Sequence, residues 1–336
     1  MAFPPLLHIL WVRGGDILDR TIFLAANSGQ GFYSLYDAFP GDGCFLHIIK
    51  GGPGTGKSGY MRRIREAAQA RGLDTLTVLC SGDPDSLDGL ALPALGQAWM
   101  DGTAPHVREP KLFGADSDYV NLGQFCRLPL SEKDRDRALA LNRAYKARYL
   151  AAYGHLSASA ALESAEELRD AEVLRAEEQR LRALLEPLPD RKGPCRREKC
   201  FISAISCQGL IRLNGVVDSL CKQKQVFRDD GSVLTLAAAI AAEKTDRVIL
   251  CPRPLKPAQP EAVLLPGLSL ALLRAPASMP VPRGDQLLSR EALSRGMEEL
   301  REAKTLHDKL ESIYKPYMDF DALTGYTASY IERLFD

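Results

Sequence analysis

The sequence has no excess of either charge. Lysine plus arginine and aspartate plus glutamate each number 43, so the formal net charge at pH 7 is zero. A domain that holds nucleic acid through its phosphates usually carries a strongly basic surface. Nothing in this charge balance favours such a surface, so nucleic acid is not expected among the partners.

Long hydrophobic runs and paired cysteine motifs are also lacking. No apolar run reaches the roughly 18 residues of a membrane-spanning helix, so no membrane span is expected. Residues 1–11 are apolar but have neither the leading charge nor the small-residue cleavage site of a signal peptide. The eight cysteines contain no Cys-x-x-Cys pair and no compact disulfide pattern. This disfavours zinc and predicts reduced thiols in a cytoplasmic protein.

What is present is typical of a globular protein of more than one domain. The chain has 336 residues, 46% of them hydrophobic and 26% charged. Such a length exceeds one ordinary hydrophobic core and indicates about two domains.

One stretch has the spacing of a phosphate-binding loop, a glycine, four residues and then Gly-Lys-Ser. It follows an apolar strand predicted over 45–50 and precedes a helix predicted over 56–70. Glycines let backbone N–H groups approach an anion, and a helix N-terminus adds positive partial charge. The candidate nucleotide-binding residues are Gly51, Gly52, Pro53, Gly54, Thr55, Gly56, Lys57, Ser58 and Gly59. Lys57 is expected on the β- and γ-phosphates, with the Ser58 hydroxyl on Mg²⁺.

A carboxylate at the end of a neighbouring strand is needed to complete the Mg²⁺ shell. Asp101 is favoured, because it ends an apolar strand predicted over 94–100. Asp83 is the competitor, at the end of a strand predicted over 75–80 and at the start of an acidic loop over 83–89. No glutamate follows Asp101, so the base common in motor-type ATPases is not visible. His106 could contact a γ-phosphate, although a single histidine in this position is more often structural.

From residue 131 onward, apolar residues recur at helical spacing in two stripes. The stripes predict a helical hairpin over 131–187, which would be a solvated arm, a substrate lid or a docking arm for a protein partner. The proline-rich segment 187–194 ends the second helix and predicts a domain boundary. We therefore predict a first domain over 1–190 and a second over 196–336.

The second domain repeats short sequences of the first in the same order. Phe23, Ser28 and Gly31 match Phe201, Ser206 and Gly209 at an offset of 178, and Leu92-Pro93 matches Leu265-Pro266 at an offset of 173. Such order predicts an internal duplication. Where a second phosphate loop should lie, 226–233 keeps one glycine, has two aspartates and lacks the lysine. The same register places Arg274 opposite Asp101. The second site has therefore lost both the lysine that would bind phosphate and the acid that would hold the metal shell.

Three stretches resemble an uncharacterised bacterial family of tandem P-loop ATPase-like proteins found mainly in Firmicutes. They are 23–32 (Phe-x-x-Ala-Asn-x-x-x-Gly-Phe), the loop 51–58, and 80–89 together with 101–106. The resemblance implies that Lys57 and Ser58 are nucleotide ligands and that Asp83, Asp85, Asp101 and His106 lie near the site. It also implies a second intact loop, which this chain lacks.

The predicted fold is α/β, a P-loop NTPase parallel sheet duplicated as two related halves with helical hairpin insertions. The predicted function is Mg²⁺-dependent ATP binding with hydrolysis that drives a switch between the halves. ATP is favoured over GTP because no Asn-Lys-x-Asp motif is present. A small-molecule kinase and a non-hydrolysing nucleotide-sensing scaffold are the alternatives.

Overall fold

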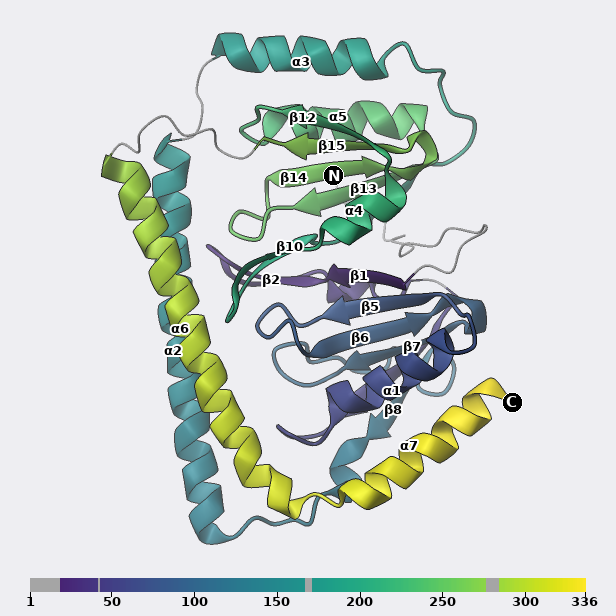
Figure 1. Ribbon diagram of the computed structural model, residues 1–336, viewed down its shortest axis with the longest axis vertical. Helices are drawn as coiled ribbons and strands as arrows, with labels where there is room; N and C mark the ends of the chain where they lie inside the picture. The colour runs from purple at the N-terminus through teal and green to yellow at the C-terminus, as the bar shows by residue number, and fades with distance from the viewer. Residues whose placement is uncertain (1–18, 42, 167–170, 276–283) are drawn as a thin grey trace.

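The two larger sheets of the structure lie one above the other, with two long helices along one side (Figure 1). The computed structural model describes residues 19–41, 43–166, 171–275 and 284–336. The apolar segment 1–11 lies outside these ranges. In the ranges described, no helix combines the length and the apolarity that a bilayer crossing requires.

The first sheet is mixed rather than fully parallel. In spatial order its strands are β1 (Asp19–Phe23), β5 (Thr75–Leu79), β6 (Leu87–Leu92), β7 (Gln97–Asp101), β4 (Phe45–Lys50) and β8 (Ser117–Asn121). Strand β6 is antiparallel to both of its neighbours, and the other adjacent pairs are parallel. The sheet is therefore mixed and is not the parallel sheet that the sequence predicts. The end of the acidic loop predicted over 83–89 belongs to β6, in which every residue is buried.

The second sheet repeats the topology of the first. Its spatial order is β12 (Gln223–Phe227), β15 (Leu270–Arg274), β14 (Pro260–Leu265), β13 (Arg247–Pro252) and β9 (Arg196–Lys199). These strands have the order and the directions of β4, β7, β6, β5 and β1. A short 3₁₀ turn joins the antiparallel pair in both halves, η2 (Pro93–Leu95) and η4 (Pro266–Leu268). The predicted strand over 94–100 therefore begins only at Gln97.

Each half also has a hairpin beside its sheet, and the two halves meet there through equivalent residues. The hairpins are β2 (Ala25–Ser28) with β3 (Gly31–Ser34), and β10 (Ser203–Ser206) with β11 (Gly209–Arg212). Phe23 and Phe201 exchange two backbone hydrogen bonds of 3.0 and 2.9 Å. The amide of Asn27 donates to the carbonyl of Ile205, 178 residues away. A contact in which matching positions pair with each other is the pattern of a two-fold related interface.

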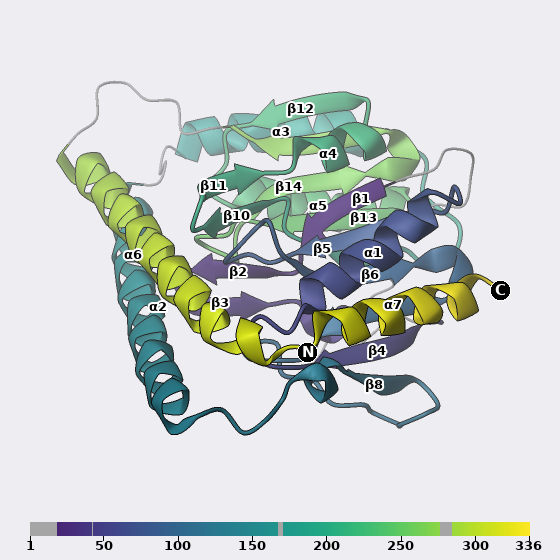
Figure 2. The same cartoon turned by 60° about the horizontal axis from the view of Figure 1, so that its bottom comes forward.

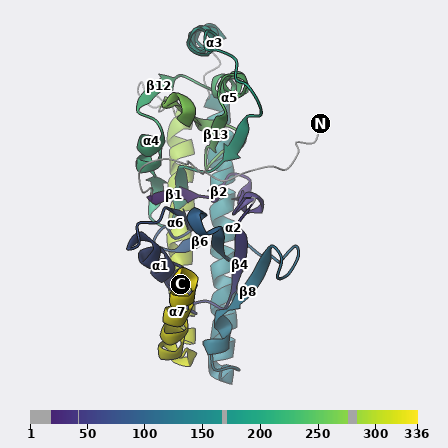
Figure 3. The ribbon, with the colours of Figure 1, turned by 90° about the vertical axis from the view of Figure 1, so that its right-hand side faces the viewer.

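The helices differ most from the sequence expectation. Helix α2 (Glu132–Glu166) is one helix of 35 residues that passes through Gly154 without a break. Its main partner is α6 (Gly284–Tyr314), and the two run side by side past both sheets (Figures 1 and 3). The hairpin predicted over 131–187 is therefore wrong. A single glycine costs a helix about 1 kcal/mol, and the surrounding alanines and the contact with α6 outweigh it.

Two helices pack on the half opposite to the one predicted. Helix α3 (Ala171–Leu185) lies on α5 (Ser232–Lys244), and its Leu181 and Leu185 enter the core of the second sheet. Helix α7 (Phe320–Phe335) lies beside α1 (Lys57–Gln69) on the first sheet (Figure 2). The packing therefore does not follow the boundaries 1–190 and 196–336. The remaining helical elements are η1 (Tyr36–Ala38), η3 (Leu122–Phe125), α4 (Asn214–Leu220) and η5 (Lys315–Tyr317).

Aromatic contacts attach the C-terminal helix to the strands of the first half. Trp99 of β7 is completely buried and donates from Nε1 to the hydroxyl of Tyr330 at 3.1 Å. Tyr60 of α1 and His47 of β4 also pack around the Tyr330 ring. Buried aromatic side chains contribute large apolar areas. The last helix therefore completes the core beneath the predicted nucleotide site.

Candidate functional site

The loop Gly51–Gly56 joins β4 to α1, as the motif predicts. Gly54 and Gly56 have φ values of 71° and 84°, in the left-handed region that favours glycine. A Cβ at Gly51 would lie 2.4 Å from the Thr55 hydroxyl, so no larger residue fits there. Helix α1 begins at Lys57, directly after the loop. These features, a tight glycine turn at a helix N-terminus, suit an oxyanion.

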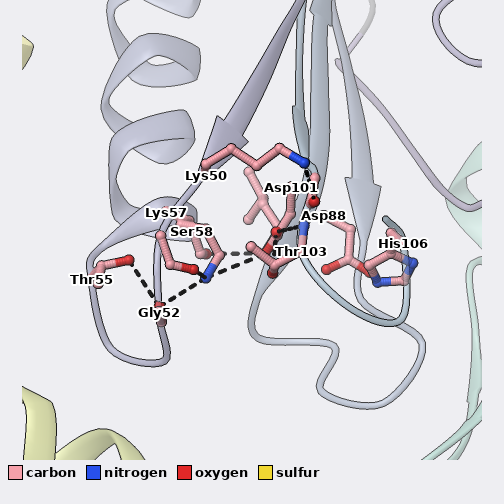
Figure 4. Close-up of polar contacts among 12 residues, drawn as sticks. Lys50, Gly52, Thr55, Lys57, Ser58, Asp88, Asp101, Thr103 and His106 are labelled. Atoms are coloured by element: carbon pink, nitrogen blue, oxygen red, sulfur yellow. Dashed lines mark hydrogen bonds and ion pairs between the residues drawn. The ribbon is translucent and has the colours of Figure 1, made fainter. Parts of the chain in front are cut away.

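Lys57 is folded back on its own loop. Its Nζ donates to the carbonyls of Gly51 at 3.2 Å and Gly52 at 3.0 Å. The same atom lies 3.7 Å from Oδ2 of Asp101, and only 13% of the Lys57 side chain is exposed. The ammonium is thus held at the mouth of the loop (Figure 4).

Asp101 lies beside this lysine because β7 is the parallel neighbour of β4. The register pairs Asp101 with Ile49, near the end of the strand that enters the loop. One carboxylate oxygen, Oδ1, accepts from the backbone N–H of Thr103 at 2.9 Å and from its hydroxyl at 2.6 Å. Oδ2 is the oxygen nearest Lys57. The structure therefore brings together Lys57 and the acid favoured for the metal shell.

Ser58 and Asp83, the other two residues predicted at the metal, have different surroundings. The Ser58 hydroxyl oxygen accepts from the backbone N–H of Leu87 at 3.0 Å, which ties α1 to β6. A hydroxyl oxygen has two lone pairs, so one stays available for a metal. Asp83 accepts from the Ser86 hydroxyl at 2.9 Å and pairs with Lys304 of α6 at 3.6 Å. Asp83 is thus engaged with the long helix.

His106 belongs to a buried cluster with Asp88, a residue of the acidic loop predicted over 83–89. Its Nε2 lies 3.0 Å from Asp88 Oδ2, which also accepts from the Tyr36 hydroxyl at 2.9 Å. Burial acts to lower the pKa of His106, but the Asp88 carboxylate outweighs it and raises that pKa. In Figure 4, Asp88 lies between Asp101 and His106. These contacts favour a structural role for His106.

In the second half, the corresponding loop joins β12 to α5 and contains Asp229. The Asp229 carboxylate accepts from the N–H groups of Gly231 at 2.8 Å and Val233 at 2.9 Å. Burial raises the pKa of Asp229, while these N–H groups act to lower it. Arg274 pairs with Phe227 in the register in which Asp101 pairs with Ile49. A phosphate at this helix N-terminus would have to displace the chain's own carboxylate.

Replacing Asp229 with alanine is expected to lower the free energy of unfolding by about 1–2 kcal/mol, the usual loss for a removed helix cap. Denaturant unfolding measures it. Asp229→Asn keeps an oxygen that can accept these N–H groups, so its loss should be smaller. Equal losses in the two variants would contradict a capping role.

Comparisons with protein-family models, with curated proteins and with solved structures find no match to this chain.

Proposed function

We propose that the first half binds the magnesium complex of ATP and hydrolyses it slowly, and that the bound nucleotide switches the relation between the two halves. The observation that carries the proposal is the position of Lys57, 3.7 Å from Asp101 at the carboxyl ends of two adjacent parallel strands. Ligands of open α/β sheets bind at such ends. Lys57 and the loop N–H groups would hold the phosphates, and Ser58 and Asp101 would hold the metal shell. Bound Mg²⁺ would neutralise charge on the phosphate oxygens.

The fit of the loop to a phosphate rests on its backbone. Two left-handed glycines, and a third glycine at which a Cβ would strike the Thr55 hydroxyl, keep the loop narrow and four of its six residues without a side chain. The N-terminus of α1 adds positive partial charge to it. These properties suit a phosphate chain better than an apolar ligand.

The switch part of the proposal is supported by the long helices. Helix α2 contacts the hairpin of the first half, and α6 contacts β10 in the second. Near its C-terminal end α6 reaches the phosphate loop, where Glu311 lies against Gly54. A shift at the loop would therefore act on an element shared by both halves.

The common strand order and the Phe23–Phe201 contact support a further part of the proposal, that the halves arose by duplication of a P-loop unit. The second unit would then have lost nucleotide binding and become a structural or regulatory partner. This organisation agrees with the tandem P-loop family that the sequence resembles, and we propose that the chain belongs to that family.

The kinase alternative is weakened, because α2 packs on α6 and does not form a lid hairpin with α3. The same packing covers the apolar stripe of α2 on which a docking arm was predicted.

Incubation with ATP labelled in its γ-phosphate, with and without pooled metabolites, tests the reaction. Release of phosphate without any acceptor supports the ATPase. Transfer that occurs only with metabolites would make the protein a kinase, and binding without turnover would make it a scaffold.

A second test separates the two candidate metal acids. Asp101→Asn is expected to weaken Mg²⁺-dependent ATP binding by about 10- to 100-fold, the range found when a group that supports a metal is removed. Asp83→Asn should have a smaller effect, because Asp83 is paired with Lys304. Titration with nucleotide at fixed Mg²⁺ measures both. The reverse order would move the metal role to Asp83.

A further inference from the structure

One face of α6 lies along the phosphate-binding loop, although about 260 residues separate them in the chain. A Cβ placed on Gly54 would be 3.2 Å from both Cβ and the carbonyl oxygen of Glu311. A Cβ on Gly52 would lie 3.6 Å from the ring of Tyr314. Positions 311 and 314 are neighbours on a helix surface. The C-terminal end of α6 therefore forms a wall beside the loop.

Two further side chains extend this wall toward the preceding turns of α6. Lys304 pairs with Asp83 at 3.6 Å and also with Asp308 of its own helix. His307 Nδ1 lies 3.8 Å from Oε1 of Glu311. Burial lowers the pKa of His307 although Glu311 acts to raise it, and the charges of Lys304 and Lys57 act in the same direction as burial. Burial thus disfavours the charged form of His307, which limits the positive charge that it offers Glu311.

The charges around the loop are poorly suited to a bare triphosphate. The ammonium groups of Lys57 and Lys304 each already lie beside a carboxylate, that of Asp101 and that of Asp83. Among the residues described, Glu311 has only His307 as an ion-pair partner. The Glu311 side chain begins at a Cβ that lies against Gly54. Its carboxylate shares the positive charge of Lys304 with those of Asp83 and Asp308, so the negative charge that it adds near the loop is only partly compensated. A polyanion entering the loop meets repulsion unless a cation accompanies it.

We propose that Glu311, brought to the loop by α6, makes the site select the magnesium complex of a nucleoside triphosphate over the metal-free form. The inference rests on the proposed function and adds to it a residue that no part of the loop motif contains. Magnesium lowers the charge of the triphosphate, so the repulsion by Glu311 acts mainly on the metal-free ligand. Asp101 would bind the metal shell, whereas Glu311 would act by repelling the metal-free triphosphate, which carries more negative charge.

Dissociation constants of the full chain test this selection, measured for ATP with excess Mg²⁺ and for ATP with EDTA. Glu311→Gln keeps the shape of the side chain and removes its charge. It is expected to tighten the binding of metal-free ATP by about tenfold, the size of one screened charge pair. The affinity for the magnesium complex should change by about threefold or less. Inorganic tripolyphosphate should show the same preference, because Glu311 acts on the phosphates.

Glu298→Gln is the matched control, since Glu298 is an exposed acid on the same helix, more than three turns away from Glu311. It should leave both dissociation constants unchanged. An unchanged ratio between the two ligands in Glu311→Gln would overturn the selective role. Weaker binding of the magnesium complex alone would overturn it too, because Glu311 would then be a metal ligand. Absence of binding in the parent and in both variants would overturn the proposed function together with this inference.

Discussion

Replacing Lys57 with alanine is expected to abolish the rise in melting temperature that MgATP produces. A hydrogen bond to a charged group contributes about 1.5–3 kcal/mol, so losing the lysine–phosphate contact should weaken binding by about 10- to 150-fold. Ligand at 100 times its dissociation constant stabilises a protein by about 2.7 kcal/mol. After a 100-fold loss of affinity, the same concentration would stabilise it by only about 0.4 kcal/mol. Differential scanning fluorimetry with and without MgATP measures the change.

The folding of the Lys57 variant needs its own check, because the side chain is mostly buried. Its ammonium donates to the carbonyls of Gly51 and Gly52, and both bonds are lost on substitution. Circular dichroism should nevertheless show an intact fold, since the loop lies at the edge of the sheet rather than in a core. Lys146→Ala, at an exposed position of α2, serves as the control and should retain the full response. If MgATP stabilises the Lys57 variant as much as the parent, the site assignment is wrong.

The sequence predicted the geometry of the part of the candidate site that is local in the chain. The loop, the strand before it and the helix after it are adjacent, and their residue types satisfy local backbone requirements. Asp101 could be predicted as well, because a strand-ending acid in a parallel sheet lies at the same edge as the loop. In the structure Asp101 does lie beside Lys57.

Sequence patterns could not predict contacts between distant segments. Glu311 and Tyr314 occupy ordinary positions in an amphipathic helix, and nothing in their spacing shows that α6 ends at the loop. Asp88 falls within the acidic loop predicted over 83–89, and the pairing of β6 with β5 and β7 is what buries it beside His106. The two apolar stripes over 131–187 predict two helices, whereas α2 continues through Gly154, a residue type that normally weakens a helix. Its partner α6, which stabilises it, begins more than a hundred residues later.

The repeated residues, which match only weakly in sequence, lie at the contact between the two halves. The offset that aligns Phe23 with Phe201 rested on a few short matches. In the structure these two residues bond to each other through their backbones, and both are completely buried. A second reciprocal pair lies nearby, with the N–H of Gly29 donating to Leu255 and that of Cys207 donating to Gly82. The aligned residues are thus also the residues through which the halves join.

This contact leads to the second prediction with a large expected effect. Phe23→Ala and Phe201→Ala should each lower the free energy of unfolding by about 3–5 kcal/mol, the usual cost of removing a buried phenylalanine ring. The two losses should be similar, because both rings lie in the same core cluster with no exposed surface. The double variant should lose less than the sum, since neighbouring residues share their contacts. Denaturant unfolding of the three variants measures these values.

Hydrogen exchange distinguishes a shared interface from two independent cores. If the rings hold the halves together, Phe201→Ala should speed amide exchange in β1 and β5 of the first half as well as in β9 and β13 of the second. Leu210→Ala, at a position 45% exposed on β11, is the control and should change stability by no more than about 0.5 kcal/mol. Faster exchange confined to the half that carries the substitution would show that each half is stable by itself. The proposed nucleotide switch would then have to act through α2 and α6 alone, because a contact that does not couple the stability of the halves cannot transmit the state of the loop.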